Sequence, residues 1–120
     1  MLSKEHKVVC ICRRGQVRSV AMRNILADRY GFLKVIACGW ENNDEVTLRM
    51  LFDWADFILV VGRGSDWNLN IPPKKTHLLN VGRDRWSRYD HPELLAILAP
   101  LVENLLGKEV SQLSMPCSTV

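Results

Sequence analysis

The chain has 120 residues, 48% of them hydrophobic, and a formal net charge of +3 at pH 7. This predicts one compact domain with its own core, and no apolar run approaches the roughly 20 residues of a membrane-spanning helix. The small charge excess does not indicate a nucleic-acid-binding protein. The four cysteines fit neither a disulfide framework nor a zinc site, and no signal peptide is evident, so we expect a cytoplasmic protein.

The first predicted elements are a strand, a tight loop and a helix. Residues 7–12 form a short apolar, β-branched run, typical of a buried parallel strand. From Val17, apolar residues recur at helical spacing as far as Tyr30, and Gly31 can end the helix. In this arrangement the loop N–H groups and the positive end of the helix dipole converge on one point, which favours a phosphate-like anion.

The side chains of this loop suit nucleophilic chemistry on a phosphate. Cys12 is the candidate nucleophile, because N–H groups and arginines stabilise a thiolate. Arg18 can hold two phosphate oxygens bidentately, Ser19 can donate to the sulfur, and Gly15 suits a positive φ. The predicted phosphate-binding residues are Arg13, Arg14, Gly15, Gln16, Val17, Arg18 and Ser19.

Cys12 to Ser19 follow the pattern Cys-x5-Arg-Ser, and here the chain resembles the low-molecular-weight protein tyrosine phosphatase family. The resemblance extends through Ala37-Cys38-Gly39 and Trp54-Ala55-Asp56, over roughly residues 7 to 106. It implies a cysteine-dependent phosphomonoester hydrolase that acts on phosphotyrosine proteins or small aryl phosphates through a phosphocysteine intermediate. No metal or organic cofactor is expected. A structural cysteine in a glycine turn is the alternative.

The second strand is predicted at residues 33–38 and ends at Gly39. Trp40 follows it, and the resemblance makes Trp40 a candidate substrate contact, with a packing role equally open. Asn42 stands three residues before Glu45, which resembles a capping box for the next helix. Most of the apolar residues of that helix should be core; the helix carries Val46, Leu48, Met50, Leu51, Phe52 and Trp54.

Residues 56–61 give the clearest buried strand of the chain. Gly62 and Gly64 follow it, but no third glycine stands at the spacing of a dinucleotide-binding loop. A short helix is predicted at residues 66–70. Pro72 and Pro73 then argue against regular structure, and residues 76–81 form the fourth predicted strand.

The loop after the fourth strand should supply the general acid that cleavage of a phosphate ester requires. Asp84 is the candidate, since Asp84-Arg85-Trp86 resembles the family's Asp-Pro-Tyr with Arg85 in place of proline. Asp90 is the alternative acid, or else the N-cap of the last helix. Trp86 and Tyr89 are candidate substrate contacts. Three arginines here either hold an acidic substrate or are solvated: Arg83, Arg85 and Arg88.

The last helix is predicted to begin at Pro92 and end at Gly107, with a kink or restart at Pro100. The alternation of strands and helices predicts a single three-layer α/β domain over residues 1–107, with helices on both faces of a four-stranded parallel sheet. The resemblance implies the strand order 2-1-3-4. Residues 108–120 are predicted to be a tail without catalytic function, and to be mobile.

Other functions remain open on the same scaffold. Arsenate reductases of the thioredoxin-coupled kind need two further late cysteines, and only Cys117 follows Cys38. A related RNA polymerase C-terminal-domain phosphatase family shares the motif in a longer chain. Arg13 and Arg14 are unusual beside the nucleophile, so the chain could instead be a phosphate-binding module without catalysis. Cys10 and Cys38 are either core thiols or resolving partners for an oxidised Cys12.

Overall fold

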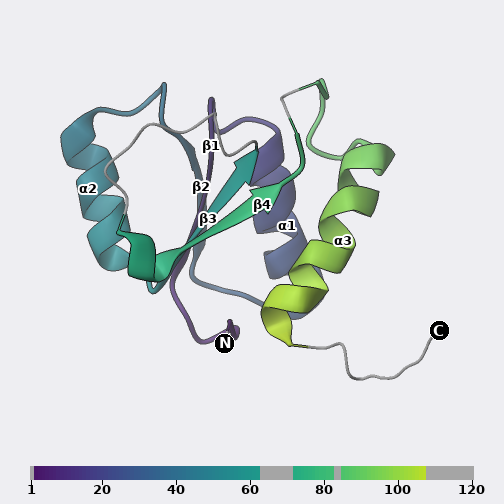
Figure 1. The fold of residues 1–120 in the computed structure, drawn as a ribbon, viewed down its shortest axis with the longest axis horizontal. Coiled ribbons are helices and arrows are strands. Elements are labelled where there is room, and N and C mark those ends of the chain that lie inside the picture. The colour runs from purple at the N-terminus through teal and green to yellow at the C-terminus, as the bar shows by residue number, and fades with distance from the viewer. Residues whose placement is uncertain (1, 63–71, 83–84, 108–120) are drawn as a thin grey trace.

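The computed structural model describes residues 2–62, 72–82 and 85–107. It shows an α/β fold with one parallel sheet in the order β2-β1-β3-β4, as the sequence predicted (Figure 1). The strands are β1 (Val8–Cys12), β2 (Val35–Gly39), β3 (Phe57–Gly62) and β4 (Thr76–Asn80). The helices are α1 (Arg18–Tyr30), α2 (Glu45–Trp54), the 3-10 helix η2 (Pro73–Lys75) and α3 (Pro92–Leu106).

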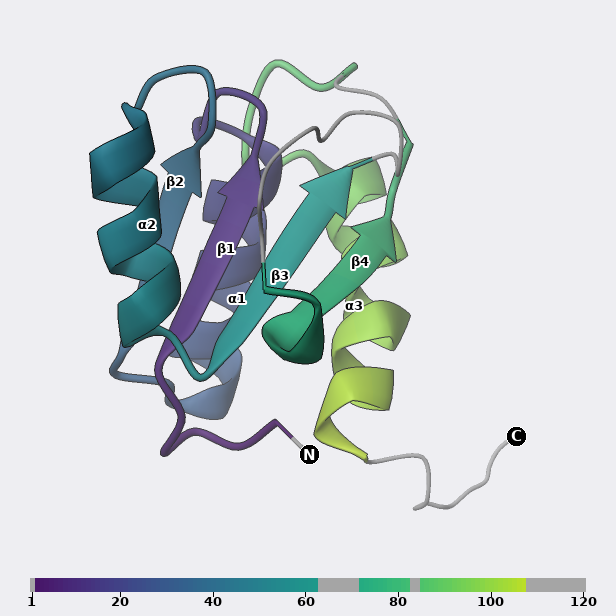
Figure 2. The same ribbon diagram turned by 60° about the vertical axis from the view of Figure 1, so that its left-hand side comes forward.

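Helices cover both faces of the sheet, which gives the predicted three layers (Figure 2). One core cluster lies between the sheet, α1 and α3, and a second lies between the sheet and α2. Successive side chains of β1 alternate between the two, with Cys10 in the first and Ile11 in the second. Both faces of β1 are therefore buried, which explains its continuous apolar sequence.

Helix α2 buries one apolar stripe and leaves two apolar residues exposed. Leu48 and Phe52 are buried, whereas Val46 is 62% exposed and Met50 is 67% exposed. A helix that packs on one sheet face buries a single stripe of side chains. Val46 and Met50 are one helical turn from each other and lie outside that stripe. Leu51 and Trp54 pack against the core cluster beside Leu48 and Phe52, so most of the six apolar residues belong to the core, as predicted.

The ends of the helices confirm the predicted stops, and the N-caps of α2 and α3 differ from the predicted ones. Gly31 and Gly107 end α1 and α3 with φ of 75° and 71°. Helix α2 is capped by Asp44, which accepts from Thr47 N at 2.7 Å, and not by a capping box at Asn42. Helix α3 is capped by His91, whose side chain accepts from Glu93 N at 3.2 Å, so Asp90 is not its N-cap.

Prolines are tolerated where the sequence predicted interruption. Pro73 opens η2, since a proline fits a first helical position that needs no N–H donor. Helix α3 continues through Pro100 without a restart. The predicted short helix at 66–70 and the tail at 108–120 lie outside the described residues. Among the described helices, none has the length and apolar character needed to cross a membrane.

Asp56 aligns the starts of the two central strands. Its carboxylate accepts from Lys7 N at 2.9 Å, and its own N–H donates to Lys7 O at 2.7 Å. The bond from Lys7 N lowers the pKa of Asp56 below its ordinary value, so the carboxylate stays charged at neutral pH. Strands β1 and β3 are thereby held in register, and the loops at their carboxyl ends meet at one edge of the sheet.

Candidate functional site: an anion cradle at the start of α1

Cys12 ends β1, and its sulfur is the point on which the following loop converges. The side chain is only 3% exposed. Gly15 N donates to the Cys12 sulfur at 3.3 Å, and Ser19 N donates to it at 3.4 Å. The thiol in turn donates to Ser19 Oγ at 3.2 Å. Backbone N–H donors from the middle of the loop and from the first turn of α1 thus surround one nucleophilic atom, as an anion-binding loop requires. We call residues 12–19 the cradle.

The N-terminus of α1 adds a favourable field for an anion. Val17 stands at the cap position and makes no side-chain capping bond, and the first turn holds no acidic residue. The partial positive charge of the helix end is therefore not neutralised by a neighbouring carboxylate of α1. An anion in front of the helix would take the place of a capping side chain.

Gly15 and Gly39 let the loop lie directly against the end of β2. Gly15 has a φ of 71°, and a Cβ there would lie 2.4 Å from Gly39 N. A Cβ on Gly39 would lie 2.2 Å from the carbonyl carbon of Arg14. Both positions therefore exclude any side chain. The sequence indicated the need for glycine at position 15, but Gly39 was interpreted only as the end of a strand.

Replacing Gly39 with alanine is expected to displace the loop, because two backbone segments would occupy the same space. Overpacking of this kind costs about 1–3 kcal/mol, and inorganic phosphate should bind at least about tenfold more weakly, because its donors depend on loop position at the ångström scale. Calorimetric titration with phosphate and urea unfolding measure the two effects.

Gly31→Ala is the matched control for the Gly39 substitution. Gly31 has a φ of 75° but no atom within 4 Å of a Cβ, so alanine adds strain of about 1–2 kcal/mol without a clash. It should lower the free energy of unfolding and leave phosphate affinity unchanged. Undiminished phosphate affinity in the Gly39→Ala protein would show that the close contact does not position the cradle.

Three residues of the loop after β2 donate hydrogen bonds to backbone carbonyls of the cradle. Trp40 N donates to Cys12 O at 3.1 Å, and Glu41 N donates to Arg13 O at 2.9 Å. The side chain of Asn42 donates to Arg14 O at 2.7 Å. These bonds satisfy the carbonyl groups of residues 12–14, while the N–H groups of Gly15 and Ser19 point at the Cys12 sulfur. Sequence reasoning did not identify Glu41 or Asn42, because no motif at their positions indicates the contact.

Trp40 takes the packing role that the sequence left open. It is partly buried and packs against the core cluster beneath α2. Its backbone bond to Cys12 O nonetheless places it beside the cradle. Its contact with substrate stays a prediction.

Arg18 joins the cradle to the loop that leaves β4. Its side chain is 1% exposed, and Nη1 donates to Gly82 O at 3.0 Å. Gly82 has a φ of 83° and also donates to the Asn80 side chain at 3.2 Å. A buried guanidinium of α1 thus anchors the chain two residues before Asp84. The predicted acid Asp84 and its neighbour Arg83 lie outside the described residues.

Trp86 lies in the core, and its role as a substrate contact stays a prediction. It is 6% exposed and belongs to the cluster with α1 and α3. Its indole N–H donates to Glu93 Oε1 at 2.9 Å, and Arg85 lies 4.2 Å above its ring. The bond from Trp86 holds the pKa of Glu93 below its ordinary value. The indole therefore fixes the returning chain to the first turn of α3.

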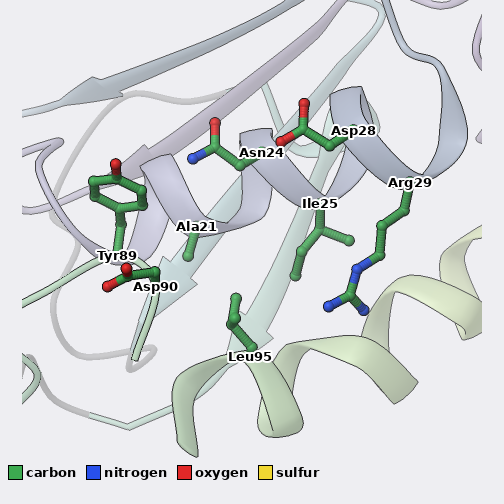
Figure 3. Close-up of a pocket in the computed structure, with 8 residues that line it drawn as sticks. All are labelled: Ala21, Asn24, Ile25, Asp28, Arg29, Tyr89, Asp90 and Leu95. Carbon is green, nitrogen blue, oxygen red and sulfur yellow. The ribbon is translucent and has the colours of Figure 1, made fainter. Parts of the chain in front are cut away.

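Tyr89 and Asp90 line a cavity of about 210 Å³ between α1 and α3 (Figure 3). Ala21, Ile25 and Leu95 also line it. Tyr89 is half exposed, while the Asp90 carboxylate forms an ion pair with Arg88 at 3.2 Å. Both residues therefore lie along α1 beyond Arg18. Tyr89 as a substrate contact and Asp90 as the alternative acid both stay predictions.

The two other described cysteines are buried thiols. Burial, and then the nearby charge of Cys12, raise the pKa of Cys38 to about 12. Burial also raises the pKa of Cys10 well above its ordinary value. Both remain protonated at neutral pH and are slow nucleophiles toward an oxidised Cys12. The packing role that the sequence favoured for them therefore gains support, although their redox behaviour stays untested.

In the described part of the chain, no three His, Cys, Asp or Glu side chains are grouped as metal ligands would be. Comparison with models of known protein families, with curated proteins and with solved structures found no match for the chain.

Proposed function

We propose that this protein is a cysteine-dependent phosphomonoester hydrolase of the low-molecular-weight protein tyrosine phosphatase type. One observation carries the proposal: the Cys12 sulfur sits where two backbone N–H groups converge at 3.3 and 3.4 Å, in a loop followed by the buried Arg18 at the start of α1. A nucleophile inside an anion cradle suits attack on a bound phosphate better than it suits a purely structural thiol.

The proposed reaction has two steps. The Cys12 thiolate attacks phosphorus in line, the P–O bond to the alcohol breaks, and Asp84 protonates the leaving oxygen. The Asp84 carboxylate then takes a proton from water, which attacks phosphorus and breaks the S–P bond. The products are the alcohol and inorganic phosphate, and Cys12 returns as a thiolate. Arg18 and the loop amides stabilise the equatorial oxygens in both steps.

Two contacts support these roles. Ser19 Oγ lies 3.2 Å from the sulfur, so its hydroxyl can turn to donate to the thiolate when the S–P bond breaks. The bond from Arg18 to Gly82 O holds the chain beside the cradle two residues before Asp84. Two residues of extended chain span at most about 7 Å, so Asp84 follows this anchor closely along the chain.

Aryl phosphates, phosphotyrosine above all, are the proposed substrates, with Trp40 as the aromatic neighbour of the cradle. A buried thiolate nucleophile also requires reducing surroundings, and we propose the cytoplasm on that ground. Arg18 and the loop supply the positive charge at the phosphate, so no metal is invoked in the mechanism.

Hydrolysis of two aryl phosphates tests the proposal. Wild type should hydrolyse both, and Asp84→Ala should lower kcat for phenyl phosphate by about 10²-fold or more. The loss should be smaller for 4-nitrophenyl phosphate, because its better leaving group needs less protonation. Asp90→Ala is the matched control and should retain a rate close to wild type.

The remaining outcomes separate the alternatives. An unchanged rate in Asp84→Ala with a loss in Asp90→Ala would transfer the acid role to Asp90. Arsenate reduction in a parallel assay, without ester hydrolysis, would identify a reductase. Tight phosphate binding without any turnover would identify a binding module and overturn the proposed function.

A further inference from the structure

Two arginines at the rim of the cradle share one carboxylate. Arg13 and Arg14 follow the nucleophile directly, and their side chains are 55% and 67% exposed. Arg13 Nε lies 2.7 Å from Glu41 Oε2, and Arg14 Nε lies 3.8 Å from Glu41 Oε1. The three side chains therefore gather on the surface at the mouth of the cradle, outside the groups that surround the sulfur.

The backbone fixes where this group of charges lies. Glu41 N donates to Arg13 O at 2.9 Å, so the residue that supplies the carboxylate is itself bonded to the residue it pairs with. Asn42 makes a further bond to Arg14 O at 2.7 Å. Figure 2 shows the β1–α1 and β2–α2 loops next to each other at the same edge of the sheet. The two arginines therefore lie on a loop that hydrogen bonds hold to its neighbour.

The group keeps an excess of one positive charge, because two guanidinium groups face one carboxylate. Exposed ion pairs contribute little to stability, so an arginine can exchange its partner for an incoming carboxylate at small cost. Arg14 is the better candidate for exchange, since it is more exposed and its contact with Glu41 is longer. Glu41 therefore competes with any anion that approaches the rim.

We propose that Arg13 and Arg14 select substrate peptides with an aspartate or glutamate next to the phosphorylated residue, and that Glu41 weakens this preference. The inference rests on the proposed function, because the phosphate must occupy the cradle for the flanking residue to reach the rim. A single flanking carboxylate matches the single excess charge of the rim. Planar guanidinium groups suit carboxylates, with which they form paired hydrogen bonds.

Peptide binding tests the inference independently of turnover. Two phosphotyrosine peptides that differ only in flanking Asp or Asn, together with their unphosphorylated forms, are titrated into Cys12→Ser protein and followed by fluorescence anisotropy. We expect the acidic phosphopeptide to bind about three- to fivefold more tightly than the neutral one, the scale of one exposed ion pair. Raising the salt concentration to 0.5 M should remove most of the difference.

Three further substitutions on the same background assign the preference to residues. Arg14→Gln should bring the two affinities together, whereas Glu41→Gln should widen the difference by freeing both arginines. Arg49→Gln is the matched control, since Arg49 also forms an exposed ion pair, but within α2, with Glu45 at 3.4 Å. It should leave the preference for the acidic peptide unchanged.

The results distinguish failure of the inference from failure of the function. Equal binding of the two phosphopeptides, both tighter than their unphosphorylated forms, would overturn the inference and leave the proposed function standing. A preference that Arg49→Gln reduces as much as Arg14→Gln would also overturn it, because general surface charge would then be the cause. Binding that ignores the phosphate altogether would count against both.

Discussion

Replacing Cys12 with serine is expected to abolish hydrolysis of aryl phosphates while leaving inorganic phosphate bound. A serine hydroxyl stays protonated at neutral pH and is a far weaker nucleophile than a thiolate. The donors at Gly15 N and Ser19 N belong to the backbone, so the substitution leaves them in place. The measurements are the initial rate, expected to fall to the uncatalysed background, and the affinity for phosphate by calorimetric titration.

Cys38→Ser is the matched control for the loss of a thiol. Cys38 is also buried, but it pairs with Ile11 in the sheet and belongs to the core cluster on the α2 side. Its replacement should lower stability and leave the rate per folded molecule close to wild type. Rapid quenching of wild type during turnover should also yield protein that carries one phosphoryl group, which Cys12→Ser should not. A Cys12→Ser rate within tenfold of wild type would exclude Cys12 as the nucleophile.

Arg18→Lys is expected to lower kcat/KM by about 10²- to 10³-fold, the scale of losing one group that stabilises the charge of the transition state. Lysine keeps the positive charge but has no planar fork, so it cannot hold two phosphate oxygens side by side. It also loses the guanidinium bond to Gly82 O at 3.0 Å, which holds the chain that leads to Asp84. Steady-state kinetics with phenyl phosphate measure the effect.

The separate contributions of kcat and KM show which role of Arg18 dominates. A fall mainly in kcat would indicate lost stabilisation of the transition state, and a rise mainly in KM would indicate lost binding of the ground state. Arg29→Lys, an exposed change in the last turn of α1, is the control and should alter neither parameter. Unchanged kinetics in Arg18→Lys would show that charge alone suffices and that bidentate geometry is not required.

Most of the fold was predictable because its signals are local. The strand runs are continuous and apolar, since both faces of β1 and most of β3 are buried, and Gly31 and Gly107 end their helices by adopting positive φ. Errors arose where more than one residue near a helix start could serve as the N-cap. Asp44 and His91 cap their helices in place of Asn42 and Asp90.

The sequence by itself determined the order of the strands and α-helices and the place of the loop around Cys12, because Cys12, Gly15, Arg18 and Ser19 are close along the chain and their spacing indicates one loop. Only the tertiary structure decided what holds that loop. Gly39 lies against Gly15, Glu41 and Asn42 bond to its carbonyls, and Arg18 reaches Gly82 across 64 positions. The tertiary structure also buries Trp86 in the core. Contacts between distant residues depend on which strands pair and where their ends meet, and local residue spacing does not specify that.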